Sequence, residues 1–69
     1  MQLFDGTKAR DIRMKKGMAQ KELARLVGVS QSYISDMEHN IKTSPSPKVL
    51  ARMAEVLGVS MDAFFVGRD

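Results

Sequence analysis

The sequence predicts an all-α fold, a single domain of five short helices. Apolar side chains recur three or four residues apart in successive segments, which is the spacing of one helix face, and nowhere do apolar and polar residues alternate as in a strand. Residues that start or end helices separate these segments. With 69 residues and no Cys, the chain has room for one small core and has neither disulfides nor cysteine-bound zinc to support it. We therefore expect residues 1–69 to form one domain held together by helix packing.

The first two helices are expected over about residues 7–16 and 20–27. Either Asp5 or Thr7 can cap the first helix, because both side chains carry an oxygen that accepts a hydrogen bond from a free amide of the first turn. Each helix is followed by a glycine in the position that favours a left-handed backbone, namely Gly17 and Gly28. The residues expected to face inward are Ala9, Ile12, the alkyl part of Lys16, Leu23, Ala24 and Val27.

The other three helices are expected over about residues 31–39, 47–57 and 61–65. A serine precedes each of them and can cap its first turn, and Pro47 stands at the first position of the fourth helix, where a missing N–H costs nothing. Asn40 follows the third helix as a residue that tolerates a left-handed backbone. The residues expected to face inward are Ile34, Met37, Leu50, Met53, Ala54 and Leu57.

Basic residues concentrate in the first third of the chain. Residues 8–25 contain seven Lys or Arg and two Asp or Glu, a local charge of +5, whereas residues 36–69 contain four and five, a local charge of −1. Double-stranded DNA, a polyanion, is therefore the first partner to consider. The longest apolar run, Ala63–Val66, is far shorter than the ~20 residues of a membrane span, and no signal-peptide stretch follows Met1–Phe4. We expect a cytoplasmic protein with no membrane partner.

The sequence holds too few reactive side chains for an enzyme. His39 is the only His, Cys is absent, and no Ser or Thr has a base at a predictable distance. Asp36 and Glu38 are two residues apart, so they point to different faces of a helix and cannot act as a carboxylate pair. Metal-ligand spacing and a glycine-rich phosphate loop are also missing. We expect no enzyme activity, no cofactor, no metal site and no small-molecule effector site.

The connection between the second and third helices consists only of Gly28, Val29 and Ser30. A connection this short sets two helices at a steep angle, as in a helix-turn-helix unit, here over about residues 20–39. Small helical bundles also use glycine turns, so the spacing alone does not decide between the two.

The segments around this turn resemble the Cro and phage-repressor type of helix-turn-helix regulators, the XRE family. Residues 20–30, QKELARLVGVS, are similar to the family's second helix and turn almost position by position, and residues 31–38, QSYISDME, resemble its recognition helix. Residues 9–20 resemble the first helix and turn, and the closing helices are matched at Pro45, Ser46, Leu50, Ala54, 57–60 and Phe64. The resemblance implies a lambda-repressor-like five-helix fold. It also implies a transcriptional repressor that inserts helix 31–39 into the major groove of a palindromic operator as a homodimer.

The third helix carries the candidates for reading DNA bases. With Ile34 and Met37 facing the core, its other face presents polar side chains that can pair with base edges, namely Gln31, Ser32, Ser35 and Asp36. The resemblance implies that Gln31 makes the leading contact, and its amide is suited to two hydrogen bonds with adenine. Asp36 departs from the family, in which Gln, Arg or Lys is frequent at this position. It either accepts a hydrogen bond from cytosine N4 or is an exposed residue paired with a nearby cation.

Contacts to the DNA backbone are expected on both sides of this helix. The resemblance implies that Gln20, at the start of the second helix, touches a phosphate and braces Gln31, with Lys21 beside it. The resemblance also implies a second phosphate contact in the loop after the third helix, from Asn40, Lys42 and Thr43, and the hydroxyl of Tyr33 can reach the same strand. Asn40 can instead be only a helix cap, Tyr33 only a packing residue, and the loop an ordinary surface loop.

The resemblance also implies a structural ion pair and a place for the dimer interface. Arg13 is expected to pair with Glu38 and so to fix the recognition helix against the bundle. Met61, Phe65 and Val66 either form the homodimer surface or simply cap the core. Two other functions remain open: a protein-interaction module that keeps the fold without the DNA contacts, and the DNA-binding component of an antitoxin or restriction-control system.

Overall fold

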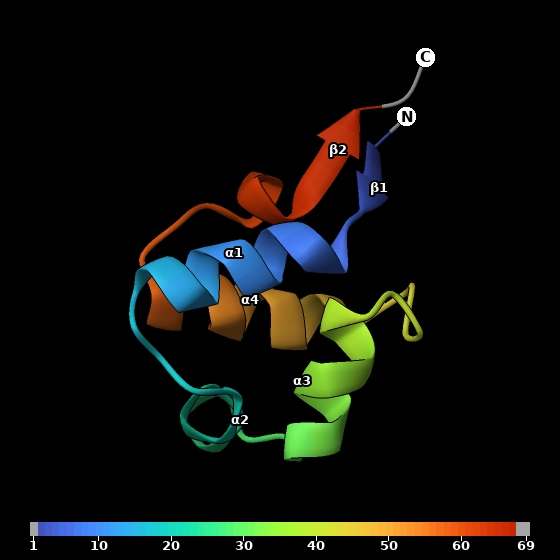
Figure 1. Ribbon diagram of the computed structural model, residues 1–69. Helices are drawn as coiled ribbons and strands as arrows, with labels where there is room; N and C mark the ends of the chain where they lie inside the picture. Colours follow the sequence, from blue (N-terminus) through green and yellow to red (C-terminus); the bar gives the residue numbers. More distant parts are fainter. Residues whose placement is uncertain (1, 68–69) are drawn as a thin grey trace.

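The computed structural model describes residues 2–67, which form four α-helices, one 3-10 helix and two short strands. The helices are α1 (Gly6–Lys15), α2 (Gln20–Val27), α3 (Gln31–Glu38), α4 (Pro47–Leu57) and the 3-10 helix η1 (Met61–Phe64). The strands are β1 (Gln2–Phe4) and β2 (Phe65–Gly67). In Figure 1, α1 lies across the molecule in front of α4, α2 is seen nearly end-on, and α3 runs from beside α2 toward the start of α1.

The expected fifth helix is wrong beyond Phe64. A single 3-10 turn ends there, and Phe65 is already extended, with φ −119° and ψ 152°. β2 then pairs antiparallel with β1, Gln2 opposite Gly67 and Phe4 opposite Phe65. Residues 2 and 67, the first and last that the structure describes, therefore lie together at one corner of the molecule, where β1 meets β2 (Figure 1). Strands of three residues are too short to show an alternating pattern, so the expectation of an entirely helical chain failed at both ends.

The expected helix ends agree with the structure to within about one residue, but two of the three expected serine caps are wrong, because the side chains of Ser46 and Ser60 accept no hydrogen bond from the first turns of α4 and η1. Gly28 and Asn40 both have a left-handed backbone, with φ 90° and 59°, directly after the last turns of α2 and α3. The hydroxyl of Ser30 accepts a hydrogen bond from the Tyr33 amide at 3.1 Å. For α1, Asp5 and not Thr7 is the cap, since its carboxylate accepts from the Thr7 amide at 3.0 Å.

All five helices contribute to the core. Its fully buried apolar residues are Ala9, Leu23, Ala24, Ile34, Met37, Leu50, Met53, Ala54, Leu57 and Phe64. The alkyl part of Lys16 does not join them, because Lys16 is exposed at the end of α1 and Arg13 occupies the inward position one turn earlier. None of the helices in residues 2–67 is long and apolar enough to span a bilayer.

Candidate nucleic-acid interface

The third helix separates a buried face from an exposed polar face. Ile34, Met37 and Glu38 are buried, whereas Gln31, Ser32 and Asp36 are exposed on α3. No ion pair forms between Asp36 and a cation of residues 2–67, so the expected alternative of a paired surface residue is not seen. The structure thus leaves three of the four expected base-reading side chains exposed along one helix.

Ser35, the fourth of these residues, is half-buried and lies against His39. The His39 Nδ1 atom is 2.7 Å from the carbonyl oxygen of Ser35 and 3.4 Å from its hydroxyl. A carbonyl only accepts hydrogen bonds, so Nδ1 carries the hydrogen in this contact. No signal in the sequence gave His39 a role in DNA binding, and the structure places it next to an expected base-reading residue.

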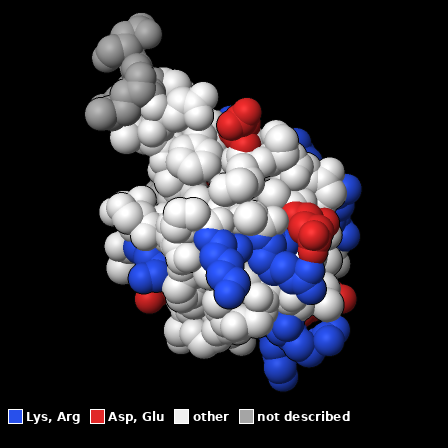
Figure 2. Space-filling model, turned by 180° about the vertical axis from the view of Figure 1, so that it is seen from behind, with Lys and Arg blue, Asp and Glu red and all other residues white. Residues whose placement is uncertain are grey.

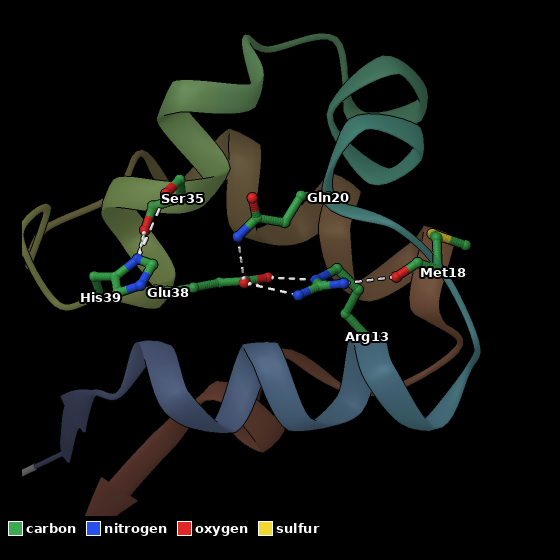
Figure 3. A network of polar contacts seen from close by, with 6 residues as sticks. All are labelled: Arg13, Met18, Gln20, Ser35, Glu38 and His39. Atoms are coloured by element: carbon green, nitrogen blue, oxygen red, sulfur yellow. Dashed lines mark hydrogen bonds and ion pairs between the residues drawn. The ribbon is translucent and has the colours of Figure 1, made fainter.

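A buried carboxylate joins three helices behind this face (Figure 3). Glu38 accepts hydrogen bonds from Arg13 at both oxygens, from Nε at 2.7 Å and from Nη2 at 3.1 Å. Their side chains are 0% and 10% exposed, respectively. The expected partners Arg13 and Glu38 thus lie together and link α1 to α3 through a bidentate contact.

Gln20 contacts this carboxylate, and not the Gln31 side chain that it was expected to brace. Its Nε2 atom donates to Glu38 Oε1 at 2.9 Å, so the expected bracing of Gln31 is not what the structure shows. A carboxylate accepts a stronger hydrogen bond than a neutral amide, which explains why the side chain turns inward. Arg13 Nη1 also donates to the carbonyl oxygen of Met18 at 2.7 Å, in the linker that leads into α2. Helix periodicity does not predict either contact.

The first turn of α2 has unused amides. Ala19 precedes the helix and has no side chain that can cap it. The first amide bonded to this end is that of Leu23, which donates to the Ala19 carbonyl at 3.0 Å. Among residues 2–67, no group accepts from the amides of residues 20–22. These free amides, the helix dipole and the exposed Lys21 favour an anion at this end of α2.

The loop after α3 folds back onto the helix. The amides of Ile41 and Lys42 both donate to the Asp36 carbonyl oxygen, at 2.8 and 3.0 Å. The Lys42 ammonium lies 4.9 Å from the centre of the Tyr33 ring, and the Tyr33 hydroxyl accepts from the Ser46 amide at 3.2 Å. The ring of Tyr33 packs against the core, which is the expected packing role, while its hydroxyl bonds to the backbone just before α4. Thr43 is exposed beside this group.

Asn40 has a structural contact of its own. Its Oδ1 atom accepts from the Gly6 amide at 2.8 Å, which ties the end of α3 to the start of α1. The pKa of Asp5, next to Gly6, is lowered, first by the hydrogen bond from the Thr7 hydroxyl and then by the Thr7 amide, with a smaller contribution from Asn40. Of the expected phosphate-contacting residues, Asn40 is thus the one with a helix-capping role in the fold.

Met61, Phe65 and Val66 do not form one outward surface. Met61 and Phe65 pack against the core, and the Phe65 ring meets that of Phe4 edge to face at 6.0 Å. Val66 pairs with Leu3, and cross-strand partners point to the same face of a sheet. Leu3 is 38% exposed, so this outer face of the sheet presents apolar surface to solvent.

Exposed basic residues are not confined to the first third of the chain. On the face opposite that of Figure 1, Lys and Arg gather across the middle and lower part of the molecule (Figure 2). Lys48 and Arg52 of α4 are exposed and line a shallow groove beside Val27 and Val29. These two cations lie outside the first third of the chain, where the positive charge had been expected.

Comparison with known proteins identifies this arrangement. The model of the Helix-turn-helix family matches residues 10–64. The transcriptional regulator SinR of Bacillus licheniformis is 36% identical over 64 residues, which are 93% of this chain and 58% of that protein. The chain thus spans a little more than half the length of this relative.

Two solved structures show the same fold in DNA-bound regulators. A structure of SinR in complex with DNA is 39% identical, with a TM-score of 0.77, over 81% of this chain and 89% of that chain. The P22 c2 repressor in complex with a synthetic operator is 30% identical, with a TM-score of 0.80, over 86% of this chain and 88% of that chain. The chain therefore belongs to the helix-turn-helix family of Cro and phage-repressor type transcription regulators, the XRE family.

Proposed function

We propose that residues 1–69 form the single DNA-binding domain of a sequence-specific transcriptional repressor that occupies a palindromic operator. One observation carries this function: α3 exposes Gln31, Ser32 and Asp36 on one side while Ile34 and Met37 anchor its other side in the core. A helix held in this way can enter the major groove with polar side chains directed at base edges.

Gln31 makes the leading base contact in this proposal. It is the first residue of α3, and the N-terminal part of the recognition helix is the part that reaches base edges. Ser32 and Asp36 read neighbouring bases, and Asp36 favours cytosine because a carboxylate accepts from its N4 amino group. Ser35 reads bases only together with His39, which lies against it.

The affinity comes mainly from the DNA backbone, because α3 itself contains no Lys or Arg. The start of α2 supplies one phosphate contact through its free amides, Gln20 and Lys21. The loop after α3 supplies the other through Lys42, Thr43 and the hydrogen of the Tyr33 hydroxyl, with the Asn40 amide nitrogen beside them. These two phosphate contacts, one on each side of α3, fix the position of the helix in the groove.

The domain binds as a homodimer, since a palindromic operator presents two half-sites about 34 Å apart. We place the dimer surface at the sheet, on the face of Leu3 and Val66. Both side chains are apolar and lie on the side of the sheet away from the Phe4 and Phe65 rings. A two-stranded sheet is marginally stable alone, so a second copy packed on this face would also stabilise it.

A protein-interaction module is the second candidate function. Its support is the groove beside the turn between α2 and α3, whose apolar residues Val27, Val29 and Val49 are flanked by Lys48 and Arg52. Such a module, or the DNA-binding part of an antitoxin or restriction-control system, would bind a protein at this groove. The two alternatives differ in DNA binding. The antitoxin or restriction-control component would still select a DNA sequence, whereas the protein-interaction module would select none.

A selection from randomised duplex DNA, repeated over a series of salt concentrations, tests the proposed function. The wild type should enrich a palindrome, and Gln31→Ala should weaken binding or relax the selected sequence at one position of each half-site, by about 1–3 kcal/mol. Gln2→Ala, which truncates an exposed glutamine of β1, is the control and should select the wild-type sequence. If no sequence is enriched at low salt, the repressor function is wrong and the protein-interaction module takes its place.

A further inference from the structure

We infer that His39 binds a phosphate of the DNA backbone when its imidazole is protonated, so that the domain binds DNA more tightly at mildly acid pH. This contact rests on the proposed function and adds to it a residue at the far end of the recognition helix. Histidine changes charge in the range of about pH 5 to 8, and His39 is the only His in a chain without Cys. One side chain would thus make the affinity for DNA depend on pH.

His39 continues the exposed polar face of α3. It directly follows Glu38, the last residue of the helix, and is itself exposed. Because it comes four residues after Ser35 and three after Asp36, it lies on the same side of the helix as these two residues. It is about 12 Å along the helix axis from Gln31. The N-terminal part of a recognition helix reaches bases, and in the homeodomain variant the C-terminal end contacts the backbone, so a phosphate is the expected partner of His39.

The His39 ring is held through one nitrogen, and the other nitrogen is free. Nδ1 lies 2.7 Å from the carbonyl oxygen of Ser35 and donates to it, as the contact at the end of α3 in Figure 3 shows. Within residues 2–67, Nε2 makes no hydrogen bond. In the neutral ring Nε2 is therefore an acceptor, which a phosphate oxygen cannot use. A proton bound at Nε2 makes it an N–H donor and makes the ring a cation, while the contact to Ser35 persists.

A cation at His39 would be the only one on the recognition helix. α3 contains no Lys or Arg, and its acidic residues are Asp36 and Glu38. Glu38 turns inward to Arg13, whereas Asp36 is exposed. The C-terminal end of a helix also carries a partial negative charge. Protonation of His39 therefore offsets a negative potential that α3 would otherwise present to a phosphate at this end.

Charged residues also stand on the elements packed against this end of α3. Asp5 and Lys8 belong to the start of α1, which lies against the end of α3, and Lys42 belongs to the loop after it. Within residues 2–67, none of the three forms an ion pair with His39. Aspartate and lysine ordinarily titrate outside the range of about pH 5 to 8, and the hydrogen bonds from Thr7 lower the pKa of Asp5 further from it. These neighbouring charges are therefore constant where histidine titrates.

Affinities measured at several pH values test the inference. Binding is measured from about pH 8 to about pH 5.5, at constant ionic strength, to the selected operator and to a random duplex of the same length. We expect the wild type to gain roughly threefold to tenfold in affinity per protomer for both duplexes, the effect of one added phosphate contact at about 0.1 M salt. The slope of log affinity against log salt concentration should also become steeper by about 1 per protomer at the lower pH.

Two substitutions fix the charge at position 39. His39→Gln is neutral throughout and should gain no affinity at the lower pH. His39→Arg is charged throughout and should bind at the higher pH about as tightly as the wild type does at the lower pH. The matched control moves the histidine: Lys15→His in the His39→Gln background places the same titrating group on an exposed position of α1. It should not restore the pH dependence, because net charge alone does not make the contact.

Circular dichroism at both pH values checks that each variant is folded. The inference is overturned if the affinity for an enriched operator does not change with pH, if His39→Gln keeps the pH dependence, or if Lys15→His restores it. A gain confined to the operator also overturns it, because a phosphate contact strengthens binding to both duplexes. If the wild type enriches no sequence at all, the proposed function fails instead.

Discussion

Gly6 at the start of α1 lies against the backbone of Met37 near the end of α3. A Cβ atom at Gly6 would be 1.8 Å from the carbonyl oxygen of Met37 and 2.9 Å from the Cα of Glu38. The two helices therefore approach backbone to backbone at the point where the Asn40 side chain accepts from the Gly6 amide. Gly6 has no left-handed φ, so the position requires glycine for lack of space alone.

Replacing Gly6 by alanine should separate these two helices. We expect Gly6→Ala to lower the free energy of unfolding by at least about 2 kcal/mol, because the carbonyl it meets belongs to the helix backbone and cannot move aside as a side chain would. Urea denaturation measures the change. Gly67→Ala is the control, since a Cβ there meets no atom within 4 Å. Equal midpoints for the two variants would contradict the close approach.

Asp5 should make the folded domain less stable as the pH falls into the acid range. Its pKa is lowered by the hydrogen bonds from Thr7, so the folded state favours the charged carboxylate. This contribution is fully present above the pKa of the unfolded chain, about 3.9, and is lost as the pH falls through the lower pKa of the folded state. We expect Asp5→Asn to lower the free energy of unfolding at pH 7. Between pH 5 and pH 2 the free energy of unfolding of this variant should fall less than that of the wild type. If the free energy of unfolding depends on pH in the same way in the wild type and in Asp5→Asn, the charge of the Asp5 carboxylate does not contribute to stability.

Lys42 should contribute to affinity without contributing to sequence choice. Its ammonium lies 4.9 Å from the centre of the Tyr33 ring, in the loop that we propose contacts a phosphate. We expect Lys42→Gln to weaken binding to the operator and to random DNA by the same factor. The slope of log affinity against log salt concentration should fall by about 1. Lys15→Gln, an exposed lysine of α1, should leave this slope unchanged, and a loss confined to one sequence would contradict the assigned role.

Leu3 tests the place of the dimer surface. Because its side chain is 38% exposed, Leu3→Lys should preserve the fold while placing a charge on the outer face of the sheet. We expect sedimentation to show a monomer, and affinity for the full palindrome to fall while affinity for an isolated half-site stays the same. Met14→Lys changes an even more exposed apolar residue of α1 and should leave assembly unchanged. A dimer that survives Leu3→Lys would place the interface elsewhere.

The helix boundaries could be predicted because the signals that set them are local. A Ser that caps α3, a left-handed Gly28 and a left-handed Asn40 each act within a few residues of the helix end they define. The exposed polar face of α3 follows in the same way from the spacing of Ile34 and Met37. These features required no knowledge of how the helices pack.

Apart from the Arg13–Glu38 pair, which the family resemblance implied, the contacts that depend on packing could not be predicted. Residue 2 pairs with residue 67 across almost the whole chain, and three-residue strands leave no periodic signal. The choice of Gln20 between Gln31 and Glu38 depends on where a buried carboxylate comes to lie, which helix spacing does not give. Gly6 was a visible signal, since a glycine directly after a capping Asp indicates either a turn or a close approach.

The pairing of β1 with β2 also sets the order in which the domain can be completed during synthesis. The strand Gln2–Phe4 leaves the ribosome before the helices, and its partner Phe65–Gly67 follows only after all four α-helices have been made. The helices can pack against one another during translation, but the Phe4 ring has no Phe65 ring to meet until the end. A nascent chain stalled within α4 would therefore hold a helical bundle whose first strand is unpaired and whose core lacks Phe64.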